Sequence, residues 1–376
     1  MNHFVCIHGH FYQPPRENPW LEAIELQDSA YPYHDWNERI TAECYAPNAA
    51  SRILDGAGRI LRIVNNYASI SFNVGPTLLS WMELHAPDTY KAIIDADVAS
   101  RERFGGHGSA LAQPYNHMIM PLATAADKRT QVLWGLYDFR RRFKRDPEGM
   151  WLPETAVDIA TLETLAECGI TFTILAPNQA ARVRTLDGGA WRSVDERSLD
   201  TSRPYLQNLP SGRSIVIFFY DSTVSRAVAF EGLLKNGEIF AERLLSIFHS
   251  GAARHIGNIA TDGETYGHHH RHGDMALAYA LYNIESTGLA RLTNYGRYLQ
   301  ERTPEHEVEI GELTSWSCAH GVERWRSDCG CTTGGPAGSV QTWRKPLRDA
   351  LDWLRDKITE PYAQRAAHLL QDPWRA

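Results

Sequence analysis

The chain has little cysteine, no long apolar run and no excess of basic residues. Six cysteines in 376 residues are too few for a disulfide scaffold and favour a reducing compartment. No apolar run approaches the roughly 20 residues that cross a bilayer, and the sequence runs straight into Phe4-Val5-Cys6-Ile7 without a charged leader. We therefore expect a cytoplasmic protein that has no membrane partner.

The charge balance also argues against a nucleic-acid partner. Lys and Arg number 38 against 45 Asp and Glu, which gives a formal net charge of −7. No block of basic residues forms the electrostatic footprint that a nucleic-acid binder needs. Aromatic residues are plentiful, with 11 Trp and 16 Tyr, and several lie in loop-like segments. Their flat faces can stack on sugar rings, although they can equally fill a core.

Short β-like runs alternate with helical patterns along most of the chain. Segments 49–65 and 123–145 have helical spacing, and repeated strand–helix units predict a parallel sheet. About seven such units favour a closed or nearly closed α/β barrel, whose active site lies at the carboxyl ends of the strands. The predicted strands are Phe4 to His8, Ser69 to Asn73, Met118 to Leu122, Met150 to Leu152, Thr171 to Leu175, Ile215 to Tyr220 and Ile256 to Ala260.

The pattern changes near Asp274. We predict a barrel domain over residues 1–274 and a helical domain over residues 275–376, with helices at 275–286, 292–301 and 340–370. A loop rich in Gly and Cys, residues 315–338, interrupts the helical part. Its Trp316 and Trp325 are candidate sugar-stacking residues if the loop folds back over the site.

Two carboxylates at predicted strand ends are candidates for glycosidic cleavage. Glu154 ends the turn Gly149-Met150-Trp151-Leu152-Pro153-Glu154, and Asp221 follows the apolar run 215–220. Cleaving a glycosidic bond takes one protonated and one ionised carboxyl group. The apolar surroundings of Asp221 would raise its pKa and make it the general acid. Either residue can alternatively be a helix cap or a solvated loop residue.

Histidines and further acids form a second set of candidates. His8 and His10 would share one face of a strand, with Gln13 just beyond, and this geometry suits hydrogen bonding to sugar or binding of a metal. Asp262 and Glu264 follow the last predicted strand. The run 268–272 contains four histidines, of which at most two can converge on one ion, because consecutive side chains point in different directions.

The loop 315–338 contains a candidate metal-binding cluster, formed by Cys318, His320, Cys329 and Cys331. These residues can form a tetrahedral zinc site, or their thiols and imidazole can remain free in an ordered loop. Their spacing does not match the usual cysteine knuckles. A disulfide between two of the three cysteines is a third, weaker alternative.

Five ordered segments resemble the conserved regions of glycoside hydrolase family 57. The resemblance spans residues 8–267 and implies an incomplete (β/α)7 barrel followed by a helical region, in retaining enzymes that act on α-glucans. It also implies that Glu154 is the nucleophile and Asp221 the general acid/base, and that the substrate is contacted by His8, His10, His117, Trp151 and Asp262. The segments are His8 to Pro14, Gln113 to Leu122, Gly149 to Glu154, Phe218 to Ser225 and Asp262 to Gly267.

The favoured function is hydrolysis or transfer of α-glucans by double displacement, which requires no cofactor. The partner is then an oligosaccharide or polysaccharide. A zinc-dependent polysaccharide deacetylase would explain His8, His10 and Asp262 but leaves Glu154 without a role. A carbohydrate-binding protein without catalysis is the third alternative.

Overall fold

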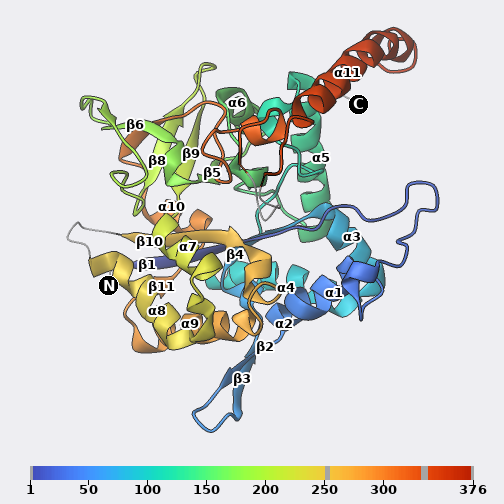
Figure 1. Ribbon diagram of the computed structural model, residues 1–376. Helices are drawn as coiled ribbons and strands as arrows, with labels where there is room; N and C mark the ends of the chain where they lie inside the picture. The colour runs from blue at the N-terminus through green and yellow to red at the C-terminus, as the bar shows by residue number, and fades with distance from the viewer. Residues whose placement is uncertain (1–2, 250–254, 332–337, 374–376) are drawn as a thin grey trace.

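The computed structural model describes residues 3–249, 255–331 and 338–373 and shows a mixed α/β protein (Figure 1). The helices are α1 (Trp36–Ile40), α2 (Ala46–Ala49), α3 (Pro76–His85), α4 (Pro87–Arg103), α5 (Ala125–Phe143), α6 (Ile159–Glu167), α7 (Ser222–Phe230), α8 (Gly237–Ser246), α9 (Gly273–Thr287), α10 (Tyr295–Glu301) and α11 (Arg344–Ala366). The strands are β1 (Phe4–Phe11), β2 (Ser51–Leu54), β3 (Ile60–Val64), β4 (Ser71–Val74), β5 (Phe172–Leu175), β6 (Ala180–Thr185), β7 (Arg192–Ser193), β8 (Pro204–Asn208), β9 (Ser214–Phe219), β10 (Ile256–Asp262), β11 (Arg291–Leu292) and β12 (His306–Ile310).

Seven parallel segments follow one another around a distorted barrel. β10 pairs with β1 and β1 pairs with β4, both in parallel, and β5 pairs with β9 in parallel. Two very short extended pieces, 110–112 and 149–150, connect β4 to β5. They do so through the parallel bridges Phe72–Ala110, Ala112–Met150 and Gly149–Phe172.

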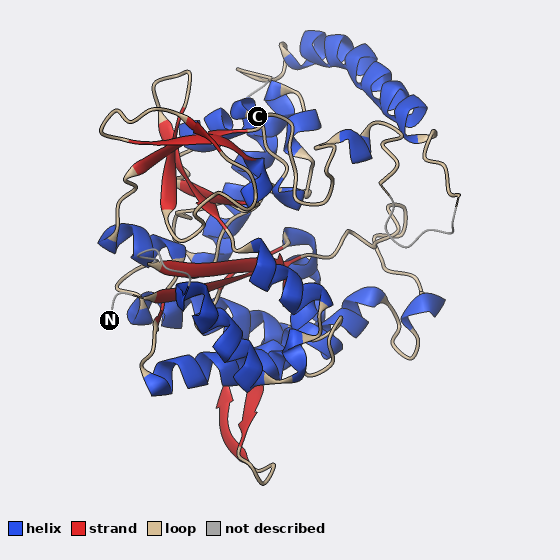
Figure 2. Ribbon diagram, turned by 60° about the vertical axis from the view of Figure 1, so that its left-hand side comes forward, coloured by secondary structure: helices blue, strands red, loops and turns tan. Residues whose placement is uncertain are grey.

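The barrel is open between β9 and β10 because both edges of β9 pair with other strands. β5 pairs with one edge, and the antiparallel β8 pairs with the other from Ser214 to Phe218. β8 in turn extends the sheet through β12, β6 and β7. The end of β9 reaches β10 through the Asp221 N–H, which donates to the Asn258 carbonyl at 2.7 Å. The expected incomplete (β/α)7 barrel is thus confirmed. Figure 2 shows the strands of the barrel and of the sheet that β8 extends, with the β2–β3 hairpin projecting below them.

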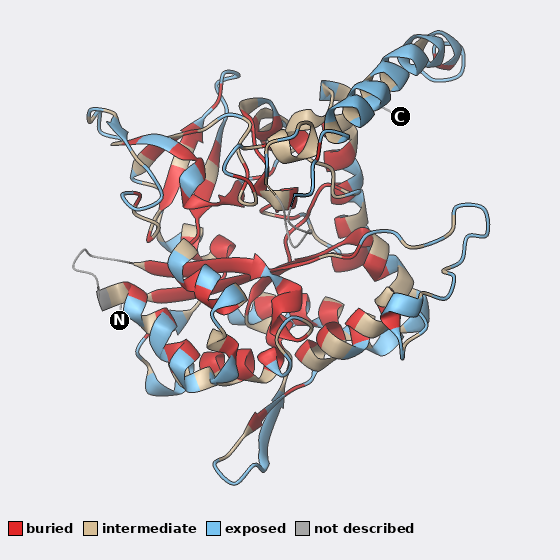
Figure 3. Cartoon of the chain, in the orientation of Figure 1, coloured by how far each residue is buried: buried red, intermediate tan, exposed pale blue. Residues whose placement is uncertain are grey.

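Alternation along β1 separates the inside of the barrel from the helix-covered outside. Phe4 and Cys6 belong to a buried aromatic cluster with Phe172, Phe218 and Tyr295. Val5 and Ile7 belong to the larger cluster that contains the helix residues. Since side chains on a strand alternate between faces, His8 and His10 continue the inner row of β1. Figure 3 shows the barrel strands as the most buried part of the molecule.

Four predicted strands are found as β1, β5, β9 and β10, and Ser69 to Asn73 overlaps β4. The strand predicted at Met118 to Leu122 is wrong. Residues Met120–Leu122 form a 3-10 turn, because Pro121 has no N–H for a strand ladder. The third barrel segment is 110–112 instead.

The helix predicted over residues 49–65 is also wrong, because this segment forms the β2–β3 hairpin. Asp55 closes the turn by accepting from the N–H groups of Ala57 and Arg59, and Gly58 has a φ of 75°. Glycine adopts this left-handed conformation readily. The apolar spacing that suggested a helix comes from Ile60, Leu61 and Ile63, which are exposed on β3.

The three predicted C-terminal helices are found as α9, α10 and α11, and α11 projects from the rest of the molecule (Figure 1). The boundary near Asp274 stays a prediction. Beyond it, β11 pairs with β1 and β12 pairs with β6 and β8, so both strands join sheets begun earlier in the chain. Of the predicted loop 315–338, residues 332–337 lie outside the described part. Within the described ranges, none of the helices has the length and apolar character needed to cross a membrane.

Candidate active site

A cavity of about 630 Å³ lies at the carboxyl ends of the barrel segments. It brings together residues far apart in the sequence. Glu154 follows the segment 149–150, Tyr220 follows β9, and Asp262 ends β10. Trp316 and Trp325 come from the loop after β12, and all five line the cavity. This is the end of the barrel at which active sites of such folds are built.

An unusual backbone conformation holds Glu154. Its φ of 57° and ψ of 19° are left-handed, and the following Thr155 has a φ of 49°. Such values are uncommon for residues other than glycine. Several hydrogen bonds hold the turn. Among them, the Thr155 N–H donates to the Leu152 carbonyl, the Thr155 hydroxyl to the Gln179 side chain, and the Trp316 backbone N–H to the Glu154 carbonyl. Strain that the surroundings maintain in this way is typical of functional positions.

The indole of Trp316 fixes the carboxylate of Glu154. Its Nε1–H donates to Glu154 Oε2 at 3.0 Å. Trp316 packs edge-on against Trp151, with ring centroids 5.1 Å apart, and against Tyr220 at 6.1 Å. The carboxylate therefore has a defined position beside the cavity.

Asp262 is the second carboxyl group on the cavity wall. Desolvation by the surrounding protein and the nearby charge of Glu154 together raise the pKa of Asp262 to about 6, while the residue remains exposed to solvent. Like charges that share a site disfavour each other's ionised form. Glycoside cleavage requires one ionised and one protonated carboxyl group, and the raised pKa of Asp262 favours its protonated form.

Asp221 lies at the N-terminus of α7. Its carboxylate accepts from the Val224 N–H at 2.9 Å and caps α7. Its neighbours Tyr220 and Ser222 line the cavity, whereas Asp221 is not among the described residues that do so. The structure therefore shows the helix-cap contact that the sequence offered as an alternative. The role of Asp221 as general acid stays a prediction.

His8, His10 and His117 form a stacked cluster beside Trp151. His8 hydrogen-bonds to Ser71 and Asn73, each at 3.1 Å, and the Nε2 atoms of His10 and His117 lie 2.9 Å apart. Burial lowers the pKa of His8 to about 3 and that of His117 to about 4. Since one nitrogen of the His10–His117 pair must accept, at least one of these rings is neutral.

Trp151 supports the site from behind. It is fully buried and stacks on His8 and His10, with ring centroids 4.7 and 5.2 Å away. It thus links the histidine cluster to Trp316. The predicted direct contact with substrate stays a prediction for Trp151 and for the histidines, which do not line the cavity in the described residues.

Glu264 and Gln13 form a buried pair and are not among the described residues that line the cavity. Gln13 donates to Glu264 at 2.8 Å, and the Tyr45 hydroxyl donates to the same oxygen at 3.1 Å. Burial raises the pKa of Glu264 to about 7. Arg16 donates to Gln13, so the pair anchors the loop that follows β1.

The contacts of the histidines and acids do not favour the zinc-dependent deacetylase alternative. Among the described residues, one group of three or more side chains could hold a metal ion, and it consists of Cys318, His320, Cys329 and Cys331. The histidine run is divided among separate partners, since His268 pairs with Glu43 and His270 with the Ala229 carbonyl. Asn73, which the sequence places at a strand end, joins His8 to His10. Sequence reasoning missed the cavity residues Glu196 and Arg324, whose segments carry no sequence signal.

Seven parallel segments with carboxylates in a cavity at their carboxyl ends define a (β/α)-type barrel with its site in the usual place. A family model described as glycosyl hydrolase family 57 matches residues 103–311. The chain belongs to this family, and the resemblance seen in the sequence is confirmed. A domain of unknown function (DUF3536) matches residues 340–376.

Solved structures of three kinds of enzyme share the fold. The exo-type maltose-forming amylase of Pyrococcus sp. ST04 matches with a TM-score of 0.70 and 14% identity, over 98% of this chain and 64% of that one. The 4-α-glucanotransferase of Thermococcus litoralis matches with a TM-score of 0.61 and 18% identity, over 87% of this chain and 44% of that one.

A branching enzyme of Thermococcus kodakaraensis, solved with glucose, matches with a TM-score of 0.59 and 16% identity, over 86% of this chain and 76% of that one. The chain thus spans less than two thirds of the length of the amylase and the glucanotransferase. A search of curated protein sequences gave no match.

Proposed function

We propose that this protein is a retaining enzyme acting on α-glucans, with Glu154 as nucleophile and Asp262 as general acid/base. The observation that carries the proposal is the pairing of the two carboxyl groups on one cavity, where the charge of Glu154 helps to raise the pKa of Asp262 to about 6. Family membership supports the reaction class. The amylase, glucanotransferase and branching-enzyme neighbours support an α-glucan as substrate.

The reaction proceeds in two displacements at the anomeric carbon. In the first, the carboxylate of Glu154 forms a glycosyl ester while Asp262 gives its proton to the glycosidic oxygen of the departing sugar. In the second, the ionised Asp262 takes a proton from water or from a sugar hydroxyl, which attacks the anomeric carbon and releases Glu154. Two inversions retain the α configuration, and no cofactor takes part.

Trp316 and Trp325 give the cavity two indole faces for glucosyl units, because flat aromatic rings stack on the apolar faces of sugars. Enclosing the glycosyl ester also limits the access of water. We propose that these walls set the balance between hydrolysis and transfer. Product analysis with a defined malto-oligosaccharide tests the proposed activity, and a protein that binds the oligosaccharide without changing it would contradict it.

Trp316→Phe should lower kcat/KM by about 10- to 100-fold. The ring that packs against Trp151 is kept, but the hydrogen bond to the Glu154 carboxylate is lost, and a bond to a charged group contributes about 1.5–3 kcal/mol. Steady-state kinetics on a malto-oligosaccharide measures the loss. Trp325→Phe is the matched control, since it removes an indole from the same cavity, and it should change kcat/KM by only a few fold. Equal kinetics for the two variants would contradict the role given to the indole N–H.

The pH profile should fall on its alkaline side near pH 6. A general acid acts in its protonated form, and the protonated fraction of Asp262 declines as the pH rises through its pKa of about 6. The alkaline limb of kcat/KM measures this ionisation in the free enzyme. In Glu154→Gln the neighbouring charge is gone, so carboxyl NMR should show a lower pKa for Asp262. An unchanged Asp262 pKa in that variant would exclude the proposed coupling.

A further inference from the structure

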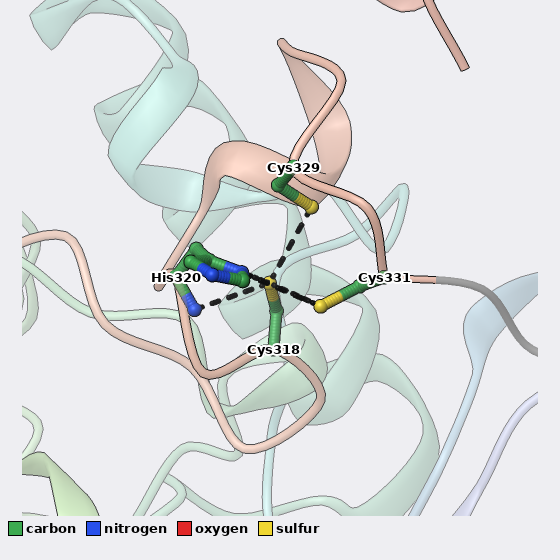
Figure 4. Close-up of side chains that lie close together, drawn as sticks. All are labelled: Cys318, His320, Cys329 and Cys331. Carbon is green, nitrogen blue, oxygen red and sulfur yellow. Dashed lines mark hydrogen bonds between the residues drawn. The ribbon is translucent and has the colours of Figure 1, made fainter. Parts of the chain in front are cut away.

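Four side chains that can bind a metal meet in the loop that follows β12. The nearest ligand atoms of Cys318, His320, Cys329 and Cys331 all lie within 4.8 Å of one another. Figure 4 shows them arriving from separate turns of the loop and facing a common centre. No part of the reaction proposed above uses them.

Their spacing fits a tetrahedral zinc site. Cys318 Sγ lies 3.8 Å from Cys329 Sγ and 3.6 Å from Cys331 Sγ, while His320 Nδ1 lies 3.8 Å from Cys318 Sγ and 3.4 Å from Cys331 Sγ. Two sulfurs bound at ~2.3 Å to a tetrahedral zinc lie about 3.8 Å apart, and a sulfur and a bound imidazole nitrogen about 3.6 Å apart. A disulfide would bring two sulfurs to about 2.05 Å.

The backbone of the loop also favours bringing the four side chains together. The His320 N–H donates to Cys318 Sγ at 3.4 Å, which stabilises negative charge on that sulfur. Gly330, between Cys329 and Cys331, has a φ of 78°, a conformation that glycine adopts without strain. The turn at Gly330 lets the two flanking sulfurs face the same centre.

We propose that Cys318, His320, Cys329 and Cys331 bind one zinc ion in a structural site. Three thiolates and an imidazole are soft and borderline donors of the kind zinc prefers. Four protein ligands fill a tetrahedral shell and leave no position for substrate, so the ion has a structural role. The metal site includes neither Glu154 nor Asp262. It does not depend on the reaction proposed for those two residues.

The site would hold one wall of the cavity in place. Trp316 precedes Cys318 by two residues, and Trp325 lies between His320 and Cys329. Both indoles line the cavity, and the Trp316 N–H is bonded to the Glu154 carbonyl. Fixing both ends of this loop restricts the freedom of the two indoles. This consequence rests on the proposed function, whereas the metal site does not.

Zinc content and X-ray absorption test the site directly. The purified holoprotein should contain about one zinc per chain, with an absorption spectrum of three sulfur neighbours at ~2.3 Å and one nitrogen at ~2.0–2.1 Å. Cys331→Ser should lower zinc retention at least tenfold after dialysis against a chelator. Cys168→Ser removes a thiol outside the cluster and should retain zinc fully. His320→Ala keeps all three sulfurs and should bind zinc more weakly, which provides a readout if the cysteine variant fails to fold.

Several results would overturn the proposal. They are a folded protein that takes up no zinc when zinc is supplied, a cysteine pair found as a disulfide, or equal zinc retention in Cys331→Ser and Cys168→Ser. None of these measurements depends on turnover. An inactive protein that holds zinc through these residues would contradict the proposed function and leave the metal site standing.

Discussion

Glu154→Gln is expected to reduce turnover of a malto-oligosaccharide by about 10⁴-fold or more, the scale seen when a catalytic nucleophile is removed. The amide keeps the size of the side chain and an oxygen that can accept from the Trp316 indole, whose Nε1 lies 3.0 Å from Glu154 Oε2. It cannot form the glycosyl ester. Steady-state kinetics measures the loss, and calorimetry should show that oligosaccharide binding persists.

Glu196→Gln is the matched control for this experiment. Glu196 lines the same cavity, and the substitution removes the same charge, but the residue has no role in the proposed reaction. We expect less than about a tenfold effect on kcat/KM, in line with the modest energies of single polar contacts. A Glu154→Gln variant as active as Glu196→Gln would eliminate Glu154 as the nucleophile.

Asp262→Asn should lower kcat/KM on glucans by about 10²- to 10⁴-fold, the contribution typical of a general acid. The loss should be much smaller for an aryl or fluoride leaving group, which departs without a proton. The ratio of the two losses, measured by steady-state kinetics on both substrates, identifies the acid. The alkaline limb of the pH profile should also disappear.

Asp221→Asn distinguishes the two candidate acids. Asparagine caps helices about as well as aspartate, so α7 and the stability of the protein should be preserved. If Asp262 is the acid, this variant keeps its activity on both substrates. Loss of glucan activity in Asp221→Asn, with Asp262→Asn unaffected, would return the role to Asp221 as the resemblance implied.

Strong local signals made much of the barrel predictable. β1, β9 and β10 contain apolar runs, and polar residues follow these runs at His8, Asp221 and Asp262. Glu154 follows Pro153, which constrains the turn. The third barrel segment, 110–112, has only small apolar residues and one leucine, and it pairs through single bridges. A segment that is stabilised almost entirely by neighbouring strands has no hydrophobic periodicity from which it could be predicted.

The sequence favoured Asp221 as the acid, because the six apolar or aromatic residues 215–220 precede it. The proposal of Asp262 rests instead on tertiary contacts. The Asp221 carboxylate accepts from an N–H at the N-terminus of α7, while Asp262 lines the cavity with Glu154. The cysteine cluster was ambiguous for a similar reason, because its sequence spacing matches no familiar zinc motif and its geometry appears only when the loop folds.

The central claim is most directly tested by trapping the glycosyl ester. An activated α-glucosyl fluoride that reacts quickly but hydrolyses slowly should label the protein once, and mass spectrometry should locate the sugar on Glu154. Asp262→Asn should increase the amount trapped, because the second displacement then lacks its base. A label on another residue, or products of inverted configuration with no labelled protein, would contradict double displacement through Glu154.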